Sequence, residues 1–79
     1  LEIIELVVSE DAPAAGQRVQ DMTLPDGSLV ISVLRDGSGF VPKADTVVEA
    51  GDEVLVVLDP GLEESITAQF VGENSNERG

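Results

Sequence analysis

The stretch SLVISVLRDGSGFVPKADTVVEAGDEVLVVL, residues 28–58, decides the fold. Its first and last segments, residues 28–34 and 53–58, are rich in Val, Ile and Leu, which favour β-strands. Both segments are apolar at nearly every position, so both faces of each strand need cover from other parts of a protein. We therefore expect two buried strands here.

Turn residues separate these strands. Asp36 and Gly37 predict a hairpin turn, because Asp-Gly supplies the positive φ that tight hairpins require. A short strand follows at residues 40–41, and Pro42 ends it because proline has no backbone N–H to donate. Short turns of this kind join antiparallel strands, so we expect a mostly antiparallel sheet.

The flanking segments add one strand and two helices. Residues 2–9 are β-rich, and residues 14–22 follow the helix-start signal of Pro13 with an apolar face at spacings of four and three. Residues 62–70 carry an apolar stripe at every fourth position and predict the second helix. The tail, residues 73–79, is polar and is expected to be disordered.

The predicted fold is thus a small α+β domain with the order β-α-β-β-β-α, covering residues 1–72. The helices would lie on one face of the sheet. A second copy of the chain or a neighbouring domain would cover the other face. Because the chain begins at Leu1 inside a predicted strand, we expect it to be a piece of a longer protein.

Composition excludes several functions. Sixteen acidic residues against four basic ones give a net charge of −12, and the basic residues are not clustered. Proteins that bind nucleic acids or anionic membranes need clustered Lys and Arg, so neither partner is expected. No apolar run reaches the ~20 residues that span a bilayer. The acidity serves solubility or attracts cations.

Catalytic and metal-binding groups are scarce. The chain has no His, Cys, Tyr or Trp, so the common general bases and nucleophiles are missing and we expect no enzyme and no catalytic residue. Carboxylates cluster in the turns, yet no EF-hand spacing is present. They are either solvated turn residues or, as a weaker alternative, a divalent-cation sensor, and no metal ligand is assigned. These carboxylates are Asp36, Asp45, Glu49, Asp52 and Glu53.

Arg35 is the basic residue best placed for a function. It ends a predicted strand close to the short apolar strand at residues 40–41. A guanidinium beside an apolar pocket can anchor a phosphate or a carboxylate. The alternative is an ion pair with Asp36 or another neighbouring acid.

An ordered set of motifs carries a family resemblance. From residue 28 to residue 57 the chain has an apolar strand, Arg-x-Gly at 35–37, a short strand ending in Pro42, Asp-Thr at 45–46, and Gly-Asp at 51–52 before the last strand. This order resembles the TrkA-C family, the C-terminal half of RCK domains (regulators of potassium conductance). The resemblance implies the same α+β fold and a homodimer that covers the second sheet face.

The resemblance also implies a function. It predicts a cytoplasmic regulatory module on the inner face of the membrane, attached to a membrane-embedded potassium transporter or channel subunit. Its ligand-binding residues would be Arg35, Phe40, Val41 and Pro42, with an anionic effector such as cyclic di-AMP at the dimer interface. No cofactor is expected in this chain, whereas NAD or ATP would bind a preceding domain. The alternative is a ligand-free structural dimerisation domain of a different ion or anion transporter.

Overall fold

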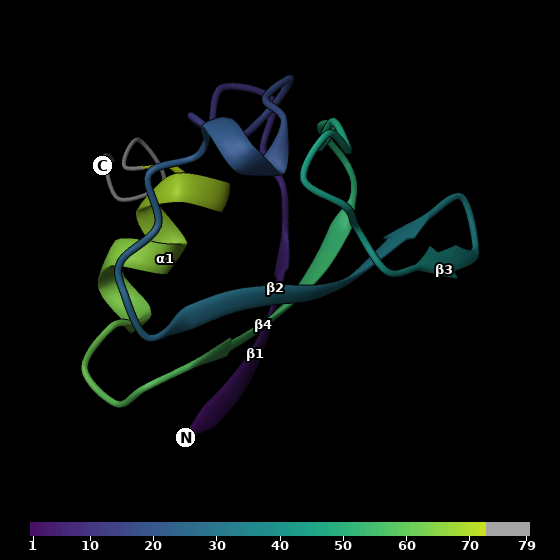
Figure 1. Cartoon of the computed structure of the whole chain (residues 1–79). Helices are drawn as coiled ribbons and strands as arrows, with labels where there is room; N and C mark the ends of the chain where they lie inside the picture. Colours follow the sequence, from purple (N-terminus) through teal and green to yellow (C-terminus); the bar gives the residue numbers. More distant parts are fainter. Residues whose placement is uncertain (73–79) are drawn as a thin grey trace.

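The computed structural model describes residues 1–72, so the predicted disordered tail lies outside the described residues. In chain order the described part contains β1 (Glu2–Val7), the 3-10 helix η1 (Val19–Asp21), β2 (Ser28–Arg35), β3 (Ser38–Phe40), β4 (Glu53–Leu58) and α1 (Glu63–Phe70) (Figure 1). The predicted α+β class, the strands and the second helix are confirmed. The short strand, predicted at residues 40–41, lies at Ser38–Phe40, so it begins two residues earlier and ends one residue earlier than expected.

The strands form one antiparallel sheet in the order β1-β4-β2-β3. The most hydrophobic strand, β4, therefore lies between β1 and β2. A bulge in β2 between Val30 and Ser32 shifts the pairing with β4. Because of the bulge, Val30 and Val33 are both buried, although a regularly alternating strand would point them to opposite faces.

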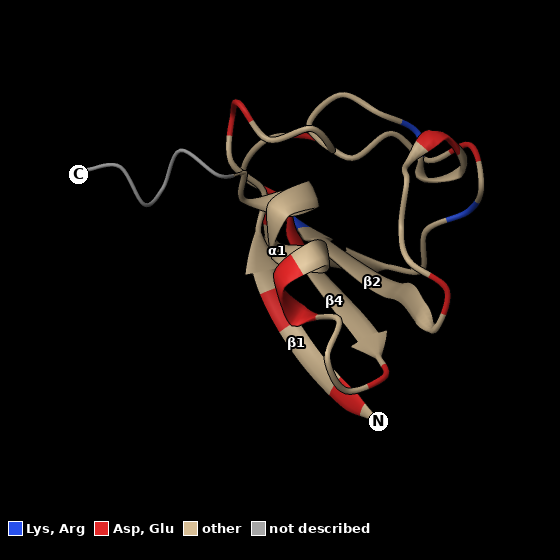
Figure 2. Ribbon diagram, turned by 90° about the vertical axis from the view of Figure 1, so that its left-hand side faces the viewer, with Lys and Arg blue, Asp and Glu red and all other residues tan. Residues whose placement is uncertain are grey.

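The core lies on one face of the sheet, called here the inner face. Every second residue of β4 points to it and is fully buried, and Ile66 and Phe70 of α1 pack there as the apolar stripe predicted. Figure 2 shows α1 over β1 and β4. The buried cluster comprises Val8, Ala14, Val30, Val33, Val48, Val54, Val56, Leu58, Ile66 and Phe70. Within residues 1–72, no helix has the length and apolar character needed to cross a membrane.

The prediction of a first helix over residues 14–22 is wrong. This segment forms turns and the single 3-10 helix η1, with Gly16 in the left-handed region at a φ of 85°. Its backbone groups bond to another loop: Gly16 N–H donates to Val48 O, and Val48 N–H donates to Gln17 O. These long-range bonds, together with the full burial of Ala14, outweigh the weak helix preference of a segment that contains glycine.

The opposite face of the sheet, called here the outer face, carries apolar side chains that nothing in the described chain covers. Ile3, Val57 and Leu29 stand side by side across β1, β4 and β2. Ile3 is 61% exposed and Leu29 is 63% exposed, while Val57 is half-buried between them. The expectation that the strands are apolar on both faces is therefore confirmed.

Candidate functional site

The register of β2 and β4 brings Arg35 next to Asp52. Leu34 pairs with Glu53 across the two antiparallel strands, so the next residue of β2 lies opposite the residue that precedes β4. The buried pair of Val33 and Val54 is on the inner face, and side chains alternate along a strand. Arg35 and Asp52 therefore share the inner face, at the end of the sheet where loop 41–52 crosses it.

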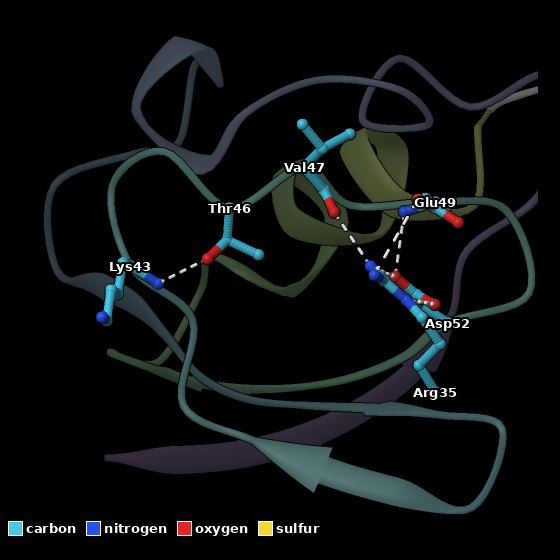
Figure 3. Close-up of polar contacts among 6 residues, drawn as sticks. All are labelled: Arg35, Lys43, Thr46, Val47, Glu49 and Asp52. Atoms are coloured by element: carbon cyan, nitrogen blue, oxygen red, sulfur yellow. Dashed lines mark hydrogen bonds and ion pairs between the residues drawn. The ribbon is translucent and has the colours of Figure 1, made fainter.

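The two side chains form a two-point ion pair. Arg35 Nε donates to Asp52 Oδ1 at 2.9 Å, and Arg35 Nη2 donates to Asp52 Oδ2 at 2.6 Å (Figure 3). Asp52 is only 2% exposed, so its carboxylate is buried beside the core. Glu49 N–H also donates to Asp52 Oδ2 at 2.9 Å, so the carboxylate accepts three hydrogen bonds.

Both groups are held in their charged forms. Hydrogen bonding from Arg35 is the main cause that lowers the pKa of Asp52 below its ordinary value, and the Glu49 N–H adds to it. The same hydrogen bond raises the pKa of Arg35. Burial of Asp52 opposes its ionisation, but charge-assisted hydrogen bonds of this geometry outweigh that cost.

Arg35 also connects loop 41–52 to the hairpin of β2 and β3. Its Nη2 donates to Val47 O at 2.9 Å, and its guanidinium carbon lies 5.3 Å from the centre of the Phe40 ring. At this distance a cation stacks favourably on an aromatic face. The side chain thus fixes loop 41–52 to the hairpin of β2 and β3 while remaining 31% exposed.

Two of the four predicted ligand-binding residues meet in the structure. Arg35 and Phe40 are in contact, whereas Val41 is 75% exposed and Pro42 is half-buried as the chain leaves β3. The alternative of an ion pair is also present, with Asp52 as the partner and not the adjacent Asp36. A guanidinium that is paired and still partly exposed can fix a loop and also meet a ligand, so neither role excludes the other.

Sequence reasoning missed three contributors to this site: the carboxylate of Asp52 as the partner of Arg35, the carbonyl of Val47 and the side chain of Glu49. The signal that the sequence lacked was the pairing register of β2 and β4. Once Val33 is paired with Val54 in the antiparallel strands, the residue two positions after Val33 and the residue two positions before Val54 must lie close together.

The structure gives no support to a divalent-cation sensor or to a pocket lined by the predicted site residues. Within residues 1–72, no three acidic side chains converge as a metal site, and Asp52 is committed to Arg35. A hollow of ≈ 770 Å³ lies between two turns, and none of the predicted site residues lines it. Its lining consists of Val7, Val8, Ser9, Glu10, Asp11, Ala50 and Gly51.

Solved structures share this fold. A structure described as an RCK domain with cda superimposes with a TM-score of 0.76 at 13% identity, over 89% of this chain and 99% of that one. The RCK_C domain dimer of S. agalactiae BusR in complex with c-di-AMP gives a TM-score of 0.76 at 22% identity, over 92% of this chain and 100% of that one. The chain therefore has an RCK_C-like fold.

Sequence comparison then places the chain in a family. The sequence model of the TrkA-C domain matches residues 3–71. The Trk system potassium uptake protein TrkA homolog of Archaeoglobus fulgidus is 40% identical over 57 residues, which cover 72% of this chain and 13% of that protein. TrkA of Mycobacterium tuberculosis (strain H37Rv) is 31% identical over 65 residues, covering 82% of this chain and 30% of that protein.

This chain belongs to the TrkA-C domain family, as its motifs predicted. It spans 13% and 30% of the length of the two curated relatives named above.

Proposed function

We propose that the chain is a non-enzymatic regulatory module of a potassium-uptake or channel system, and that it binds an anionic ligand as a homodimer. The observation that carries the proposal is the guanidinium of Arg35. Asp52 holds it in a fixed orientation, Phe40 stacks on it, and 31% of the side chain still faces solvent. A fixed and partly exposed guanidinium is a suitable anchor for a phosphate oxygen.

The ligand class follows from the site and from the relatives. The net charge of −12 disfavours random anion binding, so an anion needs a specific anchor. The structural neighbour from S. agalactiae is described as a dimer in complex with c-di-AMP. We therefore propose cyclic di-AMP as the first ligand to test, at the end of the sheet formed by Arg35, Phe40, Val41 and Pro42.

The outer face supports the homodimer. Ile3 and Leu29 are more than half exposed on a sheet face that the described chain leaves open. Contiguous apolar surface of this kind usually marks a contact with another protein. A second copy would bury the same patch on both chains, as two-fold interfaces do.

Ultracentrifugation tests the dimer. Leu29→Glu places a charge in the exposed apolar row of the outer face and should convert a dimer to a monomer, because an unpaired charge is costly to bury. Gln20→Glu adds the same charge at an exposed position of η1 and should leave the dimer intact. A monomeric native chain at high concentration would contradict the homodimer.

Calorimetric titration with cyclic di-AMP tests the ligand site. Replacing only Arg35 would leave Asp52 buried without its partner, so we use the double variant Arg35→Gln with Asp52→Asn, which removes both charges together. Its matched control is Arg18→Gln with Asp21→Asn, which removes an exposed ion pair of the same type. The first variant should lose binding and the control should keep the native affinity.

One observation favours a second candidate function. The Arg35 guanidinium already makes three hydrogen bonds, to Asp52 and to Val47 O, which suits a purely structural residue. The chain would then be a ligand-free dimerisation domain of an ion or anion transporter. A stable dimer that gives no heat with cyclic di-AMP or other anionic nucleotides would support this alternative.

The wider setting is also a proposal, because the chain spans a minor part of its relatives. We propose that it acts at the cytoplasmic face of the membrane, attached to a potassium transporter or channel subunit. An NAD- or ATP-binding domain would precede it in the full-length protein. The sequence of the complete gene product tests this directly: a strand-helix unit with G-x-G-x-x-G ahead of the chain would support it.

A further inference from the structure

The Nη1 edge of the Arg35 guanidinium differs from the other two edges in its hydrogen bonding. Nε and Nη2 are occupied by Asp52 and Val47 O. Nη1 carries two further N–H groups, and no acceptor within residues 1–72 forms a hydrogen bond with it. Glu49 Oε2 lies 3.8 Å from Nη1, which is an ion pair without a hydrogen bond (Figure 3).

Glu49 and Asp52 hold the same guanidinium very differently. The side chain of Asp52 is 3% exposed and that of Glu49 is 60% exposed. The backbone N–H of Glu49 is fixed by its hydrogen bond to Asp52 Oδ2, so its α-carbon stays beside the site. Its carboxylate, in contrast, is solvated and can move away from Nη1 at little cost, as exposed ion pairs generally can.

We propose that Glu49 is an internal competitor for the anionic ligand of this site. Its carboxylate stands at the open edge of Arg35, where a phosphate oxygen would bind Nη1, and must swing into solvent before the ligand binds. Glu49 thereby lowers the affinity both by occupying the place and by repelling the like charge of the ligand. The inference rests on the proposed function and makes Glu49 the residue that sets the affinity of the site for its ligand.

The test is a calorimetric titration with cyclic di-AMP of the native chain, of Glu49→Gln and of Glu64→Gln. Glu64 is an exposed residue in the first turn of α1, so its variant changes the net charge equally at another place. Glu49→Gln should bind about two- to fivefold more tightly than the native chain, the usual size for an exposed pair. The gain should shrink in high salt, and Glu64→Gln should match the native affinity.

The outcomes separate this inference from the proposed function. Native binding with no gain in Glu49→Gln overturns the competitor while the ligand site stands. An equal gain in Glu64→Gln also overturns it, because net charge then explains the effect. Binding by Glu49→Gln with none by the native chain supports the competitor and contradicts the proposed function of the native chain. No binding by any variant overturns both.

Discussion

The buried ion pair predicts a marked asymmetry between its two partners. Arg35→Met keeps an unbranched apolar stem near Phe40 but removes the charge that balances Asp52. The carboxylate, 2% exposed in the native chain, then keeps one of its three hydrogen bonds, the one from Glu49 N–H. Asp52→Asn is the milder change, because Asn can still accept from that N–H and the partly exposed guanidinium can turn to water.

The loss in free energy of unfolding for each variant follows from how deeply the Arg35–Asp52 pair is buried. Removing one partner of a fully buried pair costs ~3–5 kcal/mol. Because the Arg35 side chain is 31% exposed, water can reach the vacated site, and we expect about 2–3 kcal/mol for Arg35→Met. Asp52→Asn should cost about 1.5–2 kcal/mol, the lower part of the range for hydrogen bonds to a charged group.

Urea unfolding at pH 7, followed by circular dichroism, measures both costs. With an m-value of about 1 kcal/mol/M for a chain of this size, Arg35→Met should lower the unfolding midpoint by ~2–3 M. The double variant with Asp52→Asn should be more stable than Arg35→Met alone, because it leaves no unpaired buried charge. A cost for Asp52→Asn equal to or above that of Arg35→Met would refute the reasoning.

Three further predictions concern stability. The folded-state pKa of Asp52 is lowered, so the ionised Asp52 contributes to the free energy of unfolding above its unfolded pKa of ~3.9. This contribution is lost as the pH falls below that value toward the folded-state pKa. The urea midpoint should therefore fall on acidification more in the native chain than in Asp52→Asn. In thermal unfolding, Gly27→Ala should destabilise the chain more than Gly37→Ala. Both glycines have a positive φ, which alanine adopts only with strain. Only at Gly27 would the new Cβ also lie 2.5 Å from a carboxylate oxygen of Asp59. Phe70→Ala should cost about 3–5 kcal/mol in urea unfolding because Phe70 is fully buried, and a cost below about 1 kcal/mol would place it outside the core.

The parts of the fold that sequence reasoning predicted are those with strong local signals. The apolar runs of β1, β2 and β4 and the apolar stripe of α1 each indicate their own element. The segment over residues 14–22 has only a short apolar face after Pro13, and Gly16 weakens this helix signal further. Its structure is set by hydrogen bonds to residues 44–48, which are far away in sequence.

The site was predicted only where neighbours in sequence are neighbours in space. Arg35 and Phe40 are joined by a tight hairpin, so their proximity could be foreseen. The pairing of Arg35 with Asp52 depends on the register of β2 and β4, which are not consecutive strands. The bulge in β2 shifts that register, and no local pattern in the sequence marks it.

We propose that an anionic ligand binds at the exposed edge of Arg35. Two-dimensional ¹⁵N NMR of the native chain, titrated with cyclic di-AMP and including the arginine Nε–H signals, tests it most directly. The chemical-shift changes should concentrate on the Nε–H of Arg35 and on the amides of Phe40 and Glu49. Unchanged signals, or shifts confined to the hollow lined by residues 7–11 and 50–51, would contradict it.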